Sequence, residues 1–162
     1  MYAYQADSVG VLKAAAEEPV MRCTKNLQPE VRHVMTIRIV RLGSNRSRGE
    51  GLRIGTVRRP PRGVPKSEYA LQNWYDVWFP NVAPTSELMK LGRVAESEKE
   101  WAAFVRRYRA EMANPEKSRI IDLLAVLSHE ANFSVGCYCE NEARCHRSIL
   151  RELLAERGAE FE

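Results

Sequence analysis

Several features that would assign a function directly are missing from this chain of 162 residues. No stretch approaches the roughly 20 consecutive apolar residues of a membrane-spanning helix. The N-terminal residues lack a basic start followed by an apolar run, so they make a poor secretion signal. The Walker A, GxGxxG and HExxH motifs are absent, which leaves P-loop hydrolysis, dinucleotide redox chemistry and zinc peptidase chemistry without support. We therefore expect a cytoplasmic protein with no membrane partner.

Cysteine is scarce, because the chain has only four, too few for a disulfide scaffold. Three of them lie within nine residues, and a histidine follows directly, in the segment CYCENEARCH from Cys137 to His146. In a reducing compartment, clustered cysteines more often bind a metal, react as thiols or sense redox state. We therefore expect the chemistry of this protein to lie in that segment.

The balance of charge is weakly basic. The chain has 25 Lys and Arg residues against 21 Asp and Glu, a formal net charge of +4. Such a balance favours anionic partners, either a phosphate-bearing small molecule or nucleic acid. The hydrophobic content of 44% and the length are ordinary for a single globular domain. Residues 1–34 differ from the rest, and we predict an N-terminal extension that is either loosely packed or a helical arm, with its helix in DSVGVLKAAAEE.

From residue 35 onwards, strand and helix patterns alternate. Alternating apolar residues predict strands over residues 36–42, 52–57, 132–139 and 159–162. Helical spacing predicts helices over residues 86–91, 97–114, 118–130 and 143–158. Ser97 and Glu100 form a capping box, and Pro115 lies just past the end of that helix. This order predicts a small three-layer, Rossmann-like α/β domain with a largely parallel sheet over residues 35–162.

The cysteine segment falls where such a sheet binds ligands, beyond the carboxyl ends of strands and at helix N-termini. The strand over 132–139 would place Cys137 and Cys139 on one face, and the next helix would open with Cys145, His146, Arg147 and Ser148. The helix N-terminus and nearby cations would lower the pKa of Cys145, and His146 would act as a general acid or base. Arg147 and Ser148 would join the first-turn N–H groups in holding an anion. We therefore predict a catalytic or phosphate-binding pocket at this turn.

Two other uses of the cluster remain open. Cys137, Cys139 and Cys145 are ligands that zinc or iron prefers. Adjacent helical residues point about 100° apart, so Cys145 and His146 would not easily share one metal. Three cysteines plus water form the easier ligand set. A reversible disulfide between Cys145 and either strand cysteine is the second alternative.

An arginine-rich loop follows the second predicted strand. Arg58 and Arg59, with Arg53 and Arg62 nearby, would clamp phosphates beside the same crevice, or would simply form a solvated turn. Asp76, in the aromatic segment QNWYDVWF, is the nearest acidic partner for an arginine or histidine of the site. Basic loops equally suit a nucleic-acid-binding module, which is the alternative function.

The C-terminal segment also resembles the signature of a bacterial and archaeal family known as domain of unknown function 488. Its members carry a cysteine on a strand, a short acidic turn, and then Cys-His-Arg opening a helix. Cys137 and Cys145-His146-Arg147 match that spacing. Many members have Cys-Ala-Glu where this chain reads Cys-Tyr-Cys-Glu from Cys137, which displaces the acidic residue.

The resemblance extends back to residue 35. Counterparts are found for IRIVRL, TVRRPPRGVPKSEY, Trp74, the element from Ala83 to Leu88, and WAAFVRRYRAEM. The resemblance implies a compact α/β fold and brings no established reaction with it. We therefore still expect the function to reside in the cysteine segment.

Overall fold

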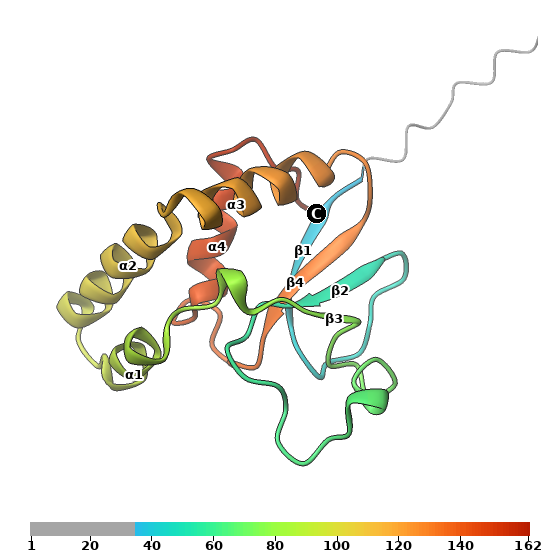
Figure 1. The fold of residues 1–162 in the computed structure, drawn as a ribbon, viewed down its shortest axis with the longest axis horizontal. Coiled ribbons are helices and arrows are strands. Elements are labelled where there is room, and N and C mark those ends of the chain that lie inside the picture. Colours follow the sequence, from blue (N-terminus) through green and yellow to red (C-terminus); the bar gives the residue numbers. More distant parts are fainter. Residues whose placement is uncertain (1–34) are drawn as a thin grey trace, which may run out of the picture. The chain divides into compact units, whose positions relative to one another are not determined.

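The computed structural model describes residues 35–162, so the predicted extension and its helix lie outside the described residues. Four parallel strands form one sheet in the order β1-β4-β2-β3. Their bounds are Ile37–Arg41 for β1, Leu52–Gly55 for β2, Val77–Trp78 for β3 and Phe133–Cys137 for β4 (Figure 1). The predicted final strand is a single parallel bridge between Phe161 and Ile37.

Four α-helices accompany the sheet: α1 Ser86–Val94, α2 Glu98–Met112, α3 Pro115–Leu127 and α4 His146–Ala155. Two short 3₁₀ helices are also present: η1, Lys66–Glu68, lies between β2 and β3, and η2, Pro80–Val82, lies between β3 and α1. The predicted capping box of α2 is confirmed, since Ser97 and Glu100 bond each other's backbone N–H groups. The prediction was wrong for α3, which begins at Pro115 rather than at residue 118. Asn114 caps it, and proline suits the first helical position because it needs no N–H partner there.

The helices cover one face of the sheet (Figure 1). That face contributes Ile37, Ile54, Phe133 and Val135 to a single apolar cluster. The helices contribute a second set of buried side chains to the same cluster, including Phe104, Tyr108, Met112, Ile121, Leu150 and Leu154. The predicted α/β fold class with a parallel sheet is confirmed. No helix among residues 35–162 has the length and apolar character needed to cross a membrane.

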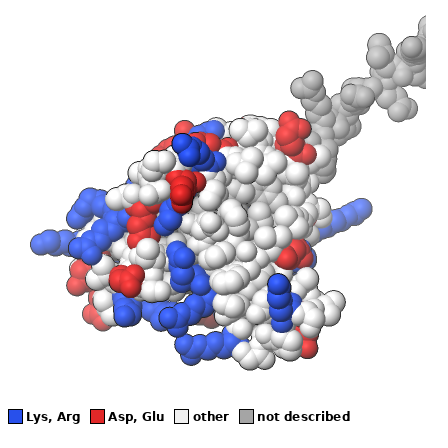
Figure 2. Space-filling view, in the orientation of Figure 1, with Lys and Arg blue, Asp and Glu red and all other residues white. Residues whose placement is uncertain are grey.

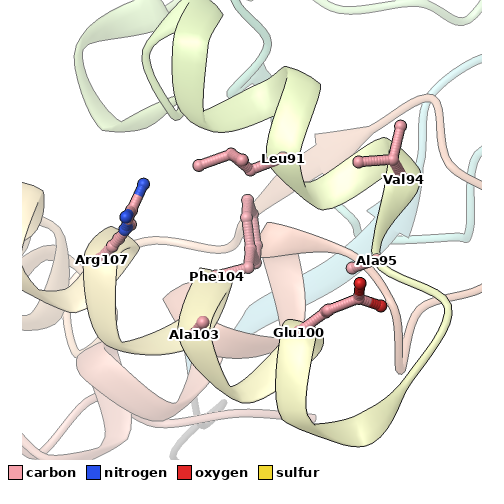
Figure 3. A pocket seen from close by; sticks show the side chains of 7 residues that line it. All are labelled: Leu91, Val94, Ala95, Glu100, Ala103, Phe104 and Arg107. Carbon is pink, nitrogen blue, oxygen red and sulfur yellow. The ribbon is translucent and has the colours of Figure 1, made fainter.

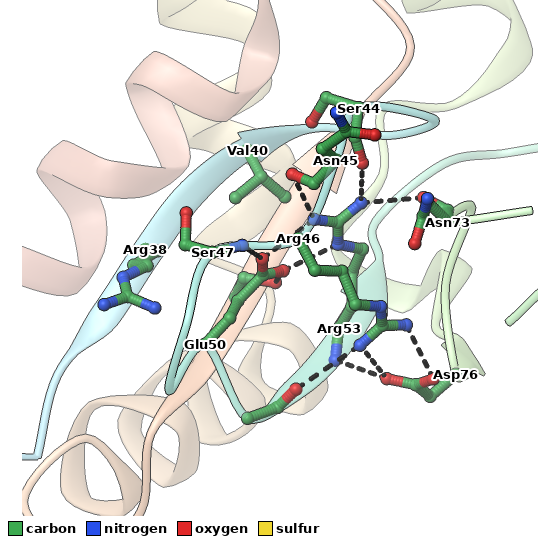
Figure 4. A network of polar contacts seen from close by, with 12 residues as sticks. Arg38, Val40, Ser44, Asn45, Arg46, Ser47, Glu50, Arg53, Asn73 and Asp76 are labelled. Atoms are coloured by element: carbon green, nitrogen blue, oxygen red, sulfur yellow. Dashed lines mark hydrogen bonds and ion pairs between the residues drawn. The ribbon is translucent and has the colours of Figure 1, made fainter.

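The opposite face of the sheet is covered by loops, which form the third layer. Arg53 points to this face, has no exposed surface and donates to both carboxylate oxygens of Glu50, at 2.6 and 2.8 Å (Figure 4). Its third nitrogen, Nη1, donates to the carbonyls of both Ser44 and Asn73, and Ser134 of β4 donates to Glu50. The prediction that groups Arg53 with phosphate-clamping arginines was therefore wrong, because this guanidinium is saturated inside the protein.

Candidate functional site

Three thiols meet at the carboxyl end of β4. The Sγ atoms of Cys137, Cys139 and Cys145 all lie within 4.8 Å of one another, and those of Cys137 and Cys139 are 3.6 Å apart. All three are free thiols. Cys137 and Cys145 are buried, whereas Cys139 is exposed. The cluster thus has two thiols inside the protein and one at the surface.

The strand is shorter than predicted, and this brings the third sulfur in. β4 ends at Cys137, so Cys139 does not continue the alternation of the strand but lies in the turn that follows. Cys145 is the N-cap residue of α4, with an extended backbone conformation. The turn between β4 and α4 folds back, so the end of β4, the turn itself and the start of α4 each contribute one thiol.

Arg147 holds this turn in place. Its side chain is 3% exposed, and one terminal nitrogen donates to the carbonyls of Val40 and Cys137, each at 3.3 Å. The other terminal nitrogen donates to the carbonyl of Glu140 at 3.4 Å, and Nε lies 3.6 Å from the Glu142 carboxylate. Arg147 therefore ties β1 and β4 to the turn. Its two terminal nitrogens are directed at backbone carbonyls rather than at solvent.

His146 is buried beside the thiols and is neutral. Its Nε2 lies 2.8 Å from the carbonyl of Thr56, and since a carbonyl only accepts, Nε2 carries the proton. Burial lowers the pKa of His146, which outweighs the opposing effect of that hydrogen bond. The unprotonated Nδ1 lies 3.8 Å from Cys145 Sγ. The predicted imidazolium beside Cys145 is therefore wrong, because this ring has too little contact with water to stay charged.

The charge of the thiols concentrates on Cys139. Hydrogen bonds from the thiols of Cys137 and Cys145 lower the pKa of Cys139, and the positive charge of Arg147 lowers it further. Hydrogen bonds to the thiols of Cys137 and Cys139, together with burial, raise the pKa of Cys145. The predicted lowering of the Cys145 pKa is corrected, because Cys145 is the buried donor and Cys139 the exposed acceptor.

The structure brings only part of the predicted site together. Arg58 donates to the carbonyls of Ala83 and Pro84, and Ser148 donates to the carbonyl of Cys145 at 2.8 Å. Arg59 is exposed, and its carbonyl accepts from the hydroxyl of Tyr138. Asp76 forms a bidentate pair with Arg46 beside the start of β2, away from the thiols (Figure 4).

Sequence reasoning missed two residues of this site. Thr56 supplies the carbonyl for His146, and its own N–H and hydroxyl both donate to the carbonyl of Gly136. Tyr138 lies between two of the thiols in sequence and packs against Trp74, with ring centroids 5.6 Å apart. A tyrosine between two cysteines was a visible signal for the second residue. The role of Thr56 could not be found in the sequence, because it depends on a backbone carbonyl that every residue has.

A small cavity opens elsewhere on the molecule, between α1 and α2. Leu91 and Val94 line one side, and Phe104 lies at its floor, with Glu100 and Arg107 at the rim (Figure 3). None of its lining residues belongs to the thiol cluster. The cavity and the thiol cluster are therefore separate features.

Comparison with known proteins bears on the family alone. No curated protein and no solved structure matches this chain. A family model described as the active DUF488-N3 subclade matches residues 37–158, which include every strand and helix of the described domain and all three clustered thiols. The chain belongs to the DUF488 family, in the subclade that this model describes.

Proposed function

We propose that this protein is a metal-dependent enzyme whose three clustered cysteines hold one zinc ion and leave a fourth position open for water. The observation that carries the proposal is the convergence of three sulfurs, two buried and one exposed, within 4.8 Å. Catalytic zinc sites have three protein ligands and an open position, whereas structural sites are closed by four.

The spacing of the sulfurs suits such an ion. With Zn–S bonds of about 2.3 Å, the sulfurs of a tetrahedral site lie about 3.8 Å apart. The Sγ atoms of Cys137 and Cys139 are 3.6 Å apart, and Cys145 completes the group. His146 is not a member of that group, in keeping with the expectation that Cys145 and its neighbour cannot share one metal. The three thiols need only small rotations to bind.

The surroundings suit a thiolate-rich centre as well. Three thiolates and one Zn²⁺ carry a net charge of −1, and the buried guanidinium of Arg147 lies beside them to balance it. His146, neutral and fixed by Thr56, keeps its lone pair on the Cys145 side. Such outer contacts orient metal ligands and adjust their basicity.

The exposure of Cys139 points the open position toward solvent. Zinc lowers the pKa of a bound water to about 7, which supplies a hydroxide for hydrolytic chemistry at neutral pH. The family description, which calls the matching subclade active, supports an enzyme rather than a purely structural domain. We therefore favour hydrolysis as the reaction class.

The test is elemental analysis of protein purified without chelator or affinity metal, combined with thiol counting. A Cys23→Ser background leaves only the three clustered thiols. We expect one zinc per chain, no thiol reacting with Ellman's reagent before chelation, and three reacting afterwards. Cobalt substitution should give the intense thiolate-to-metal absorption bands of a tetrahedral site.

Single serine substitutions at each of the three positions should lower zinc affinity by at least about tenfold. Ser47→Ala, in an exposed loop on the far face, is the matched control and should leave the metal content unchanged. The proposal fails if the protein binds no zinc, cobalt or iron and Cys139 alone is rapidly alkylated. That result would make the cluster a reactive-thiol site.

A further inference from the structure

We propose that the substrate reaching the thiol cluster is a single-stranded nucleic acid, bound by an aromatic and basic rim made of Arg59, Arg62 and Tyr138. Its role as substrate rests on the proposed function, whereas the binding itself does not. The argument depends on where the rim lies, on its unbalanced charge and on its aromatic rings.

The rim lies directly beside the thiols. The segment after β2 leaves the sheet at Thr56, whose carbonyl accepts from His146, and Val57 packs in one apolar cluster with Cys137 and Cys145. Two residues later the carbonyl of Arg59 accepts from the hydroxyl of Tyr138, at 3.3 Å. The backbone of Arg59 therefore lies within hydrogen-bond distance of the Tyr138 side chain, in the turn that carries Cys139, and the Arg59 residue is exposed there.

The positive charge of the rim is not balanced within the protein. Other arginines near the turn are paired: Arg41 with Glu140, and Arg144 with Glu98. Arg59 and Arg62 are exposed, and among residues 35–162 no carboxylate lies within ion-pair distance of either. Figure 2 shows Lys and Arg side chains along the lower left edge, and in Figure 1 this edge runs from α1 to the loop after β2. Unpaired guanidinium groups of this kind bind phosphate bidentately.

Aromatic rings lie beside these charges. Tyr138 is half-buried, and its ring meets Trp74 edge-on, with Trp74 also half-buried. Partly exposed aromatic rings next to arginine are the combination with which proteins stack the bases of single strands, worth roughly 1–3 kcal/mol per base. The exposed thiol and exposed arginines form an open surface, which suits an extended strand better than an enclosed small molecule.

Binding is tested by fluorescence anisotropy with a labelled oligothymidine of roughly 20 nucleotides. We expect a micromolar Kd at low salt that weakens as salt is raised, because phosphate contacts release counterions. The Arg59→Ala/Arg62→Ala variant should bind roughly tenfold more weakly, and the slope of log Kd against log salt should fall by about 1.4. Arg48→Ala, an exposed arginine of the loop on the far face, is the matched control and should match wild type.

A second pair of variants separates base stacking from charge. Tyr138→Ala should weaken binding several-fold, whereas Tyr138→Phe should not, since it keeps the ring and removes only the hydroxyl. The proposal would be overturned if Arg48→Ala lost as much affinity as the Arg59→Ala/Arg62→Ala variant. It would also be overturned if heparin bound as tightly as the oligonucleotide and Tyr138→Ala had no effect, because binding would then depend on charge alone. Binding is measured with and without zinc, so that a failure of the metal proposal and a failure of strand binding are told apart.

Discussion

Arg147 carries a full charge yet is 3% exposed, and its guanidinium donates to backbone carbonyls of β1, β4 and the turn. We expect Arg147→Ala to lower the free energy of unfolding by about 2–4 kcal/mol, since it removes the hydrogen bonds of a buried, charged guanidinium to three carbonyls. It should also weaken zinc binding, because the turn that carries Cys139 loses its anchor. Urea unfolding and zinc titration measure the two effects.

Arg106→Ala, on the exposed face of α2, is the control for Arg147 and should change neither quantity. Arg147→Lys keeps the charge but offers one nitrogen in place of the fork, so it should recover only part of the stability. A stable Arg147→Ala variant with normal zinc affinity would mean that the turn is held by other contacts.

Glu50 gives the domain a dependence on acid. Burial raises the pKa of Glu50, but hydrogen bonds from Arg53, Ser134 and Ser47 outweigh it and lower the pKa from 4.5 to about 2. The ionised carboxylate therefore stabilises the native state fully above pH 4.5, and this contribution, about 3 kcal/mol, is lost as the pH falls toward 2. Urea unfolding at several pH values should show this loss.

A Glu50→Gln variant isolates that contribution. It should be about 3–5 kcal/mol less stable at neutral pH, because Arg53 is left buried without a counter-charge, and its stability should fall less between pH 4.5 and 2. Glu162→Gln, which removes an exposed partner of Arg38, is the control and should keep the wild-type acid dependence. An unchanged acid dependence in Glu50→Gln would assign it to other carboxylates.

The arginines show that the burial of a single residue could not be predicted from the sequence. Arg53 and Arg59 lie in one basic stretch and look alike there, yet one is buried and the other exposed. The difference arises because Arg53 falls on the loop-covered face of β2, opposite Ser134 of β4. That pairing joins residues far apart in sequence, and no local pattern reveals it.

At the scale of elements, α2 depends on its N-terminal cap. Ser97 accepts from the N–H of Glu100, whose carboxylate accepts from the N–H of Ser97 in return. Ser97→Ala should lower the free energy of unfolding by about 1 kcal/mol, measured by urea unfolding. Ser67→Ala, in the exposed η1 segment, should leave it unchanged. An equal loss in both variants would mean that the cap has no specific role.

The elements also divide into those that local sequence determines and those that it does not. The capping box could be predicted because its two residues are three apart and bond each other. The end of β4 could not, because alternation continues through Cys139 while pairing with β1 stops at Cys137. Because the strand ends two residues earlier than the pattern predicts, Cys139 is the exposed member of the thiol cluster rather than a residue of the strand.

At the scale of the whole molecule, the main apolar core and the thiol cluster are distinct. The large cluster on the helix face contains none of the three cysteines, and Cys137 and Cys145 pack in a smaller group with Leu42, Val57 and Tyr75. The family and the α/β architecture could be anticipated from the spacing of motifs. The convergence of the three sulfurs could not be predicted from the sequence, because it depends on how the turn after β4 folds back.

This separation predicts how the protein responds to metal removal. A ligand that binds only the native state adds about 2.7 kcal/mol of stability at a hundredfold excess over Kd, so zinc should raise the Tm by about 10 °C. Chelation should reverse that shift but leave the far-UV circular dichroism unchanged at room temperature, because the main core needs no cysteine. A Cys139→Ser variant should show at most about half of this zinc-dependent shift, because a tenfold loss of affinity removes about 1.4 kcal/mol. If chelation instead abolishes the helical signal, then the metal sustains the fold itself, and the open coordination position loses its argument.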